Sequence, residues 1–253
     1  MDALRDRVVI VTGASGGIGA AAAEALAAAG ARVVLAARRP EALENVCERI
    51  CQAGGTAVPV PTDMRNEQSV EHLIEAALET YGALDALVNN AAVGMVRTIA
   101  DGRTEEWRTM IETNLLGTLF ACRAALRPML ARGAGDILNV TSAAAYEAWP
   151  YLAVYAATKA AVHALSQGLR AEVADKGIRV MTLEVHNVSG TGFAGSFDPA
   201  VAKEAVKHWE QRGLLRRASG MLQPQDAARA IVFQLAQPNP ASVHHLSLRA
   251  RAN

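Results

Sequence analysis

The stretch VVIVTGASGGIG, residues 8–19, decides the fold that this sequence predicts. It begins with a continuous apolar run of the kind found in strands that are buried on both faces. A turn with Gly13, Gly17 and Gly19 follows, and the alanine-rich segment after it predicts a helix over residues 18–29. Such glycines leave room for a ligand against the backbone, and the N–H groups that begin the helix face a pyrophosphate. We therefore predict a dinucleotide-binding turn here.

The same alternation of short apolar strands and longer helical patterns continues along the chain. Fully apolar strands separated by helices form a parallel sheet with helices on both of its faces. We predict one α/β domain over residues 1–253, a Rossmann-type doubly wound parallel sheet of about seven strands. The further strands are expected at residues 31–37, 56–62, 83–91, 135–142, 177–185 and 242–248, and the further helices from Pro40 and at 67–80, 104–131, 150–175, 199–211 and 224–236.

Residues 186–222 differ from the rest of the chain. They are rich in Gly and Ser around a helical stretch at 199–211. In a doubly wound fold, a long excursion after a late strand covers the ligand crevice at the carboxyl ends of the strands. We predict that this segment is a lid over the substrate.

Composition excludes several classes of function. The 25 Lys and Arg residues balance 25 Asp and Glu residues, so no long-range field gathers nucleic acid or an acidic membrane. The N-terminus has no signal-peptide pattern and no apolar run is long enough to span a membrane. An odd count of three cysteines suits a reducing, cytoplasmic location. Cys47 and Cys51, one helical turn apart, are interpreted as helix packing, and no metal site is predicted.

The end of the second strand indicates which dinucleotide binds. An NAD enzyme places Asp or Glu there, whereas this chain has Arg38 and Arg39. A guanidinium suits a 2′-phosphate, so NADP(H) is favoured over NAD. We expect Arg38 to contact the phosphate with Arg39 as its helper. The alternative is that both arginines are simply solvated. Asp63 is either a hydrogen-bond acceptor for adenine or a helix N-cap. The amides of Asn89 and Asn90 either bind ribose or tie neighbouring strands together.

Tyr155 is the tyrosine that we expect to act as an acid or base. It stands four residues before Lys159, which places both side chains on one face of a helix. A neighbouring ammonium favours the phenolate, so we expect Lys159 to lower the pKa of Tyr155 from its usual value near 10. Tyr151 is expected on the same helix without a cation one turn ahead, and Tyr146 in the loop before it.

Ser142 and Asn114 complete the candidate catalytic set. Ser142 ends the fifth strand, at the carboxyl edge of the sheet, where its hydroxyl reaches a substrate oxygen. Asn114 is unfavourable in the middle of a helix, which suggests a role for it. Its backbone carbonyl could be freed to bind a water that passes protons to Lys159.

Together these motifs resemble the short-chain dehydrogenase/reductase family over nearly the whole chain. The resemblance rests on TGASGGIG, NNAA (89–92), NLLG (114–117), Ser142 and YAATK (155–159), and the AARR segment and the tail are similar to an NADP-preferring branch with bacterial hydroxy-acid and clavulanate-type dehydrogenases. It implies that Tyr155 is the general acid or base, that Lys159 also holds the nicotinamide ribose, and that the enzyme is a homotetramer or homodimer. It implies cofactor contacts from Gly13, Ser15, Gly17, Ile18, Gly19, Arg38, Asp63 and Asn90.

Two positions depart from the family pattern. Ala92 replaces the glycine of NNAG, which we expect the fold to tolerate. Val185 and His186 replace a Pro-Gly turn that lies against the nicotinamide. A bulky His186 alters the fit of the cofactor or contacts substrate, unless the loop takes another path.

The chemistry that we expect is hydride transfer between NADP(H) and a small alcohol or carbonyl compound. Dehydratase or epimerase chemistry is a second possibility, and a sensor or scaffold with little turnover is a third, which only the altered turn at 185–186 supports. Arg212, Arg216 and Arg217 either meet an acidic substrate or are solvated, and no catalytic role is expected for His244 and His245. Candidate walls of the substrate site are Ala144, Tyr146, Trp149, Tyr151, Phe193, Phe197 and Trp209.

Overall fold

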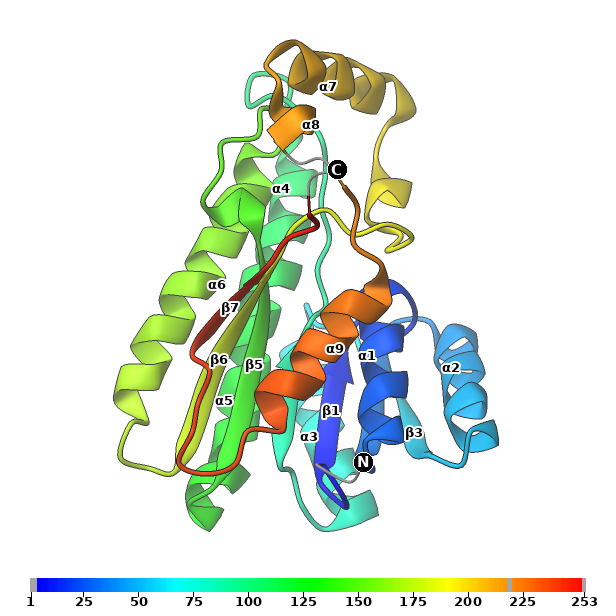
Figure 1. The fold of residues 1–253 in the computed structure, drawn as a ribbon, viewed down its shortest axis with the longest axis vertical. Helices are drawn as coiled ribbons and strands as arrows, with labels where there is room; N and C mark the ends of the chain where they lie inside the picture. The colour runs from blue at the N-terminus through cyan, green and yellow to red at the C-terminus, as the bar shows by residue number, and fades with distance from the viewer. Residues whose placement is uncertain (1–3, 218–219, 252–253) are drawn as a thin grey trace.

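A computed structural model describes residues 4–217 and 220–251 of the chain. Seven parallel strands form one sheet in the order β3-β2-β1-β4-β5-β6-β7, so the order reverses between β1 and β4. This is the predicted doubly wound sheet, and its carboxyl ends meet at one edge (Figure 1). The strands are β1 (Val8–Thr12), β2 (Arg32–Ala37), β3 (Thr56–Pro61), β4 (Ala86–Asn89), β5 (Gly135–Ser142), β6 (Ile178–Val185) and β7 (His245–Leu248).

Helices cover both faces of the sheet. One face carries α1 (Gly17–Ala28), α2 (Pro40–Gln52) and α9 (Pro224–Leu235). The other carries α3 (Glu67–Tyr81), α5 (Gly117–Arg132) and α6 (Ala153–Glu172). Within residues 4–217 and 220–251, no helix combines the length and the apolar character that a membrane span requires.

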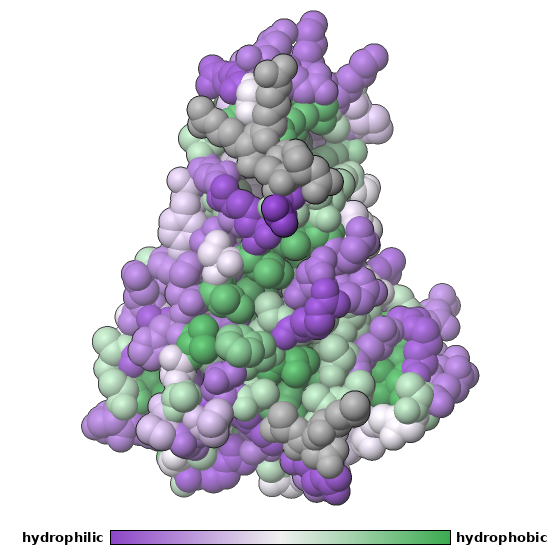
Figure 2. Space-filling view, in the orientation of Figure 1, coloured by the Kyte–Doolittle hydropathy of each residue, from purple (hydrophilic) through white to green (hydrophobic). Residues whose placement is uncertain are grey.

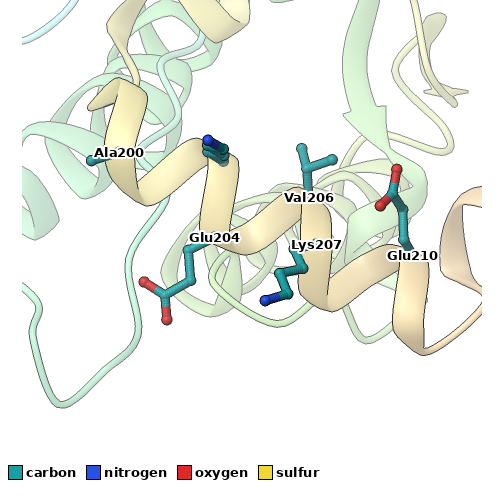
Figure 3. Close-up of a pocket in the computed structure, with 6 residues that line it drawn as sticks. Ala200, Glu204, Val206, Lys207 and Glu210 are labelled. Atoms are coloured by element: carbon teal, nitrogen blue, oxygen red, sulfur yellow. The ribbon is translucent and has the colours of Figure 1, made fainter.

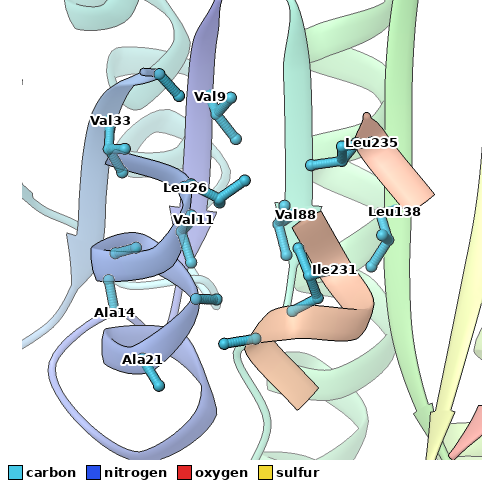
Figure 4. Packing of buried hydrophobic residues seen from close by; sticks show 14 of the residues in the cluster. Val9, Val11, Ala14, Ala21, Leu26, Val33, Val88, Leu138, Ile231 and Leu235 are labelled. Carbon is cyan, nitrogen blue, oxygen red and sulfur yellow. The ribbon is translucent and has the colours of Figure 1, made fainter. Parts of the chain in front are cut away.

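Small side chains let α1 lie close to the sheet and to α9 (Figure 4). Four consecutive alanines, residues 20–23, are buried, and they belong to the same cluster as Val11 and Ile231. Alanine loses no side-chain entropy in a helix, so this segment combines strong helix propensity with a close approach. The close approach brings the N-terminus of α1 to the carboxyl edge of the sheet.

Two of the expected long helices differ from their predicted extent. The segment predicted as one helix over 104–131 is α4 (Thr104–Ile111), a π-helical turn η1 (Glu112–Leu116) and then α5. The helix predicted from residue 150 begins only at Ala153. Tyr151 lies before it with φ 70, so the expectation that Tyr151 is on this helix was wrong. Periodicity does not reveal a one-residue π insertion or a left-handed residue before a helix.

The segment 186–222 rises above the carboxyl edge of the sheet (Figure 1). It contains η3 (Phe193–Ser196), α7 (Pro199–Gln211), which matches its predicted bounds, and α8 (Leu214–Arg217). Its two ends are joined, because Ser189 N donates to Leu222 O and Leu222 N donates to Asn187 O. The excursion therefore begins and ends at one point of the sheet.

Asp136 holds the opposite edge of the sheet together. It is 3% exposed, and in the β5–β6 register it stands directly beside Arg179. Its carboxylate accepts from Arg179 Nε at 2.6 Å and from Arg7 Nη2 at 2.5 Å. Both arginines also donate to the carbonyl of Leu235 at the end of α9. One buried carboxylate thus joins β1, β5, β6 and the end of α9.

We expect Asp136→Asn to lower the free energy of unfolding by about 2–3 kcal/mol, because it leaves two partly buried guanidinium groups without their anion. Urea unfolding followed by circular dichroism measures the loss. Asp6→Asn is the matched control, since the Asp6–Arg32 pair is exposed and we expect a change within about 0.5 kcal/mol. Equal effects of the two substitutions would contradict the role of Asp136.

Candidate active site

The glycine turn after β1 packs backbone against backbone. Gly13 has φ 69, and a Cβ on it would lie 2.9 Å from Ala91 Cα. A Cβ on Gly19 would overlap the carbonyl oxygen of Gly13. Larger residues would therefore push the first turn of α1 away from the strand, which is the reason for glycine at both places.

The N-terminus of α1 is suited to an anion. No described side chain caps this helix, its first turn contains no acidic residue, and a Cβ on Gly16 would meet open space. Its first N–H groups are thus available with the positive end of the helix dipole. Ser15 and Ile18 lie at this end of the helix, and their contact with a pyrophosphate stays a prediction.

Arg38 and Arg39 are both exposed at the end of β2, at the same edge of the sheet. Arg39 Nη2 donates to Ser15 Oγ at 3.2 Å, which links the second strand to the glycine turn. Arg38 lies near enough to Asp63 to help lower the pKa of that carboxyl. The structure thus places both arginines at the carboxyl ends of the strands, near the glycine turn and Asp63.

Asp63 is not the N-cap of α3. Asn66 is the cap, since its side chain accepts from Ser69 N at 3.1 Å. Asp63 instead forms a fork with Arg65, with Arg65 Nη2 at 2.7 Å from Oδ2, and this hydrogen bond is the main cause of the lowered pKa of Asp63. Its alternative role, as an acceptor for adenine, stays a prediction. Arg65 was not identified from the sequence, because nothing local marks it as a partner of Asp63.

The two asparagines at the end of β4 tie strands together. Asn89 Nδ2 donates to Asn139 Oδ1 of β5 at 2.9 Å, and Asn90 Nδ2 donates to Thr12 O of β1 at 2.9 Å. Thr12 Oγ1 in turn accepts from the backbone N–H groups of Asn90 and Ala91. Of the two roles considered for these amides, their donors take the strand-tying one, and ribose binding by Asn90 stays a prediction.

Ser142, Tyr155 and Lys159 meet at the carboxyl end of β5. Tyr155 is 8% exposed and hydrogen-bonded to Ser142, whose Oγ also accepts from Ala144 N at 3.2 Å. Lys159, one turn further along α6, donates to Val140 O at 2.9 Å. The predicted common face of Tyr155 and Lys159 is therefore the face that α6 turns toward β5.

Burial decides the pKa values of the two groups. It raises the pKa of Tyr155 to about 12, against the opposing effect of the Ser142 hydrogen bond. It lowers the pKa of Lys159 to about 8. The expected lowering of the tyrosine pKa by the lysine is thus wrong for these residues by themselves, because desolvation disfavours both charged forms.

Asn114 occupies the π-helical turn and is 1% exposed. Its side chain accepts from Val93 N at 2.8 Å and donates to Val93 O at 2.8 Å and to Thr158 Oγ1 at 3.1 Å. Its backbone carbonyl, expected to be free, accepts from Thr118 Oγ1 at 2.8 Å, although a carbonyl oxygen can accept a second bond. Thr158, which the sequence analysis missed, lies within the YAATK motif between the tyrosine and the lysine.

His186 is turned toward the neighbouring strand. Its Nε2 lies 2.9 Å from Glu184 Oε1 and 3.3 Å from Arg249 Nη2, and its backbone N–H donates to Leu248 O, which continues the β7 ladder. Val185 is buried in the core. The side chain at position 186 is thus engaged by β6 and the end of β7, and the alternative of a protein with little turnover stays a prediction.

The expected walls of the substrate site divide into two groups. Ala144, Trp149, Tyr151, Phe193, Phe197 and Trp209 form one apolar cluster with Tyr155. Tyr146 instead lies edge-on to His163 and His245 and is 52% exposed. Arg212 is solvated, and the side chains of Arg216 and Arg217 lie outside the described residues.

The hollow drawn in Figure 3 is not this site. All the residues that line it belong to the single helix α7, where the exposed Lys207 and Glu210 project from the helix. The cluster around Tyr155 includes residues of β5, α6 and the segment 186–222. The candidate site is therefore this cluster and not the hollow on α7.

Comparisons with known proteins match most of this chain. The family model described as short chain dehydrogenase matches residues 7–201. An uncharacterized oxidoreductase of Staphylococcus aureus strain USA300 is 36% identical over 249 residues, which are 98% of this chain and 99% of that protein.

Solved structures of the same fold include cofactor complexes. An alcohol dehydrogenase from the archaeon Thermococcus sibiricus, complexed with 5-hydroxy-NADP, is 31% identical with a TM-score of 0.83 and covers 97% of each chain. A variant of the actinorhodin polyketide ketoreductase with NADPH is 28% identical with a TM-score of 0.83 and covers 96% of each chain. The sheet order, the glycine turn and the family match lead to one conclusion: this chain belongs to the short-chain dehydrogenase family.

Proposed function

We propose that this protein is an NADP(H)-dependent oxidoreductase that transfers hydride reversibly between the nicotinamide and a small alcohol or carbonyl substrate. The observation that carries the proposal is the meeting of Ser142, Tyr155 and Lys159 at the carboxyl end of β5. That edge of a doubly wound sheet is where ligands bind. The oxidoreductase relative supports the class of reaction.

NADP(H) is the cofactor that the residues at the crevice fit best. The uncapped start of α1 offers N–H groups to a pyrophosphate, and Arg38 with Arg39 offers guanidinium groups to a 2′-phosphate. The NADP-type complexes of the similar structures support the same choice. When bound, the cofactor supplies or accepts the hydride; the protein positions the substrate and handles the proton.

Ser142 and Tyr155 bind the substrate oxygen in this proposal. During reduction Tyr155 gives its phenolic proton to the oxygen as negative charge develops there. Burial keeps the phenol protonated, which is the state that this step needs. The buried amine of Lys159 lies one helical turn from Tyr155. Asn114 is a positioning residue, since its side chain binds Val93 and Thr158.

The proposal also includes a lid, a cellular location and an oligomeric state. Segment 186–222 acts as the lid within a single domain, and the three free cysteines suit a cytoplasmic location. A homodimer or homotetramer would cover the edge strand β7 and the exposed apolar residues Ile111, Leu116, Leu119 and Phe233. Figure 2 shows apolar surface between hydrophilic regions on one face of the molecule.

Tyr155→Phe tests the proton transfer. We expect turnover with NADPH and a ketone to fall about a thousandfold, because the acid is lost while the ring stays. NADPH binding, measured by fluorescence titration, should be kept. Tyr81→Phe, at the end of α3, serves as the matched control with normal turnover, and near-normal activity of Tyr155→Phe would refute the assignment.

Lys159→Met tests the buried amine. The lysine pKa is lowered from 10.5 to about 8, so the unfolded chain binds more protons between these pH values and stability rises with pH there. From pH 8 to 10 we expect the wild-type free energy of unfolding to gain about 2 kcal/mol relative to Lys159→Met. Urea unfolding at several pH values measures this difference. Lys207→Met, on the exposed face of α7, should keep the wild-type slope.

Arg38→Ala tests the choice of cofactor. Loss of a charged hydrogen bond to the 2′-phosphate should weaken NADPH binding about 10- to 100-fold and leave NADH binding unchanged. Fluorescence titration with both cofactors measures the ratio. Arg127→Ala, an exposed arginine on α5, is the control, and equal losses for NADPH and NADH in Arg38→Ala would contradict the role.

A further inference from the structure

Phe193 lies beside the proposed acid. Its ring centroid is 4.9 Å from that of Tyr155 and 5.1 Å from that of Phe197. A Cβ on Gly94 would overlap Cε2 and Cζ of Phe193, so the ring fills the notch that this glycine leaves after β4. The space between Gly94 and Tyr155 therefore has the size and the apolar lining of one six-membered ring.

Two glycines in the left-handed region precede Phe193. Gly190 and Gly192 have φ 64 and φ 72, a region that glycine enters at little cost, and a Cβ on either would meet open space. The longer helix α7 is fixed instead, because Trp209 Nε1 donates to Pro150 O at 2.8 Å and Tyr151 Oη donates to Glu204 Oε1 at 2.8 Å. The backbone of Thr191, between the two glycines, lies against Gly17, so a turn of the Phe193 side chain itself is what would open the space while α7 stays in place.

Polar atoms at the border of this space are already paired. Trp149 Nε1 donates to Glu147 Oε2 at 3.3 Å, and the polar atoms of Trp209 and Tyr151 have the partners given above. Trp149 and Trp209 pack edge to face, with ring centroids 5.4 Å apart. The aromatic residues therefore offer carbon surface and no free donor to a ligand.

Two arginines that the structure describes near this border, Arg97 and Arg249, are paired as well. Arg97, whose backbone N–H donates to Tyr151 O, lies 2.8 Å from Glu106 Oε2 and 3.5 Å from Asp198 Oδ2. Arg249 lies 2.6 Å from Glu147 Oε1. A substrate carboxylate here would lose its hydration and would have to compete with these carboxylates for a cation, which is costly.

From this we infer that the site takes an uncharged ketone or aldehyde with an aryl or comparable branched apolar group, and that this group lies in the subsite between Gly94 and Tyr155 that Phe193 fills. The inference rests on the proposed function. In the reduction, the carbonyl carbon receives hydride from NADPH and the oxygen receives a proton from Tyr155, which gives the secondary or primary alcohol and NADP⁺. Tyr155 recovers its proton from solvent.

Acetophenone and phenylglyoxylate form a matched pair of probes, because they share the ring and the carbonyl and differ in a methyl group against a carboxylate. We expect kcat/KM with NADPH to be at least about tenfold higher for acetophenone, owing to the cost of an unpaired buried carboxylate. Consumption of NADPH followed at 340 nm measures both. Equal or better use of phenylglyoxylate overturns the inference.

Gly94→Val tests the subsite itself. A larger side chain should fill the notch, so the ratio of kcat/KM for acetophenone to that for the small diketone 2,3-butanedione should fall at least about tenfold. Gly168→Val is the matched control, since Gly168 is exposed on α6 and a Cβ there meets open space. Gly94→Ala replaces the valine variant if the latter does not fold, and an unchanged ratio overturns the subsite.

The outcomes separate this inference from the proposed function. If 2,3-butanedione is reduced while acetophenone is not preferred, the proposed function stands and the substrate class falls. If fluorescence titration shows NADPH binding but no carbonyl compound is reduced and no alcohol oxidised, the proposed function fails and the substrate class falls with it.

Discussion

The hydrogen bond from the Lys159 amine to the Val140 carbonyl is the contact on which the candidate site depends. It gives a partner to a side chain that is 4% exposed, whose charge costs free energy to bury. Tyr155 precedes Lys159 by one turn of α6, and Ser142 follows Val140 by two residues of β5. A single contact between helix and strand therefore brings the phenol to the serine hydroxyl at the edge of the sheet.

Buried polar side chains keep this helix and strand in register. Asn139 of β5 donates to Ser166 Oγ of α6 at 2.8 Å and accepts from Asn89 of β4. Asn114 joins the loop after β4 to Thr158 of the same helix. Satisfied polar networks in a core have few alternative arrangements, so they favour one position of α6 over any that slides along the sheet. The π-helical turn is the local cost of pointing Asn114 inward.

Most of the fold could be predicted from the sequence, because it follows from local patterns. The buried strands are continuous apolar runs, and α7 begins at Pro199 behind the cap Asp198, as its helical pattern indicates. The errors lie where tertiary contacts override periodicity. Residues 112–116 adopt a π-helical turn so that Asn114 reaches Val93, and Tyr151 takes a positive φ, which places its hydroxyl on Glu204.

The sequence alone determined the parallel sheet, the glycine turn and the common face of Tyr155 and Lys159, because each follows from spacing within one or two elements. Only the tertiary structure decided which distant partners the polar side chains take: Asn90 binds Thr12, Asn114 binds Val93 and Asn139 binds Ser166. It also reversed the expected direction of the tyrosine pKa and seated Phe193 beside Gly94. These outcomes depend on burial and on which segments pack together, and no local pattern encodes either.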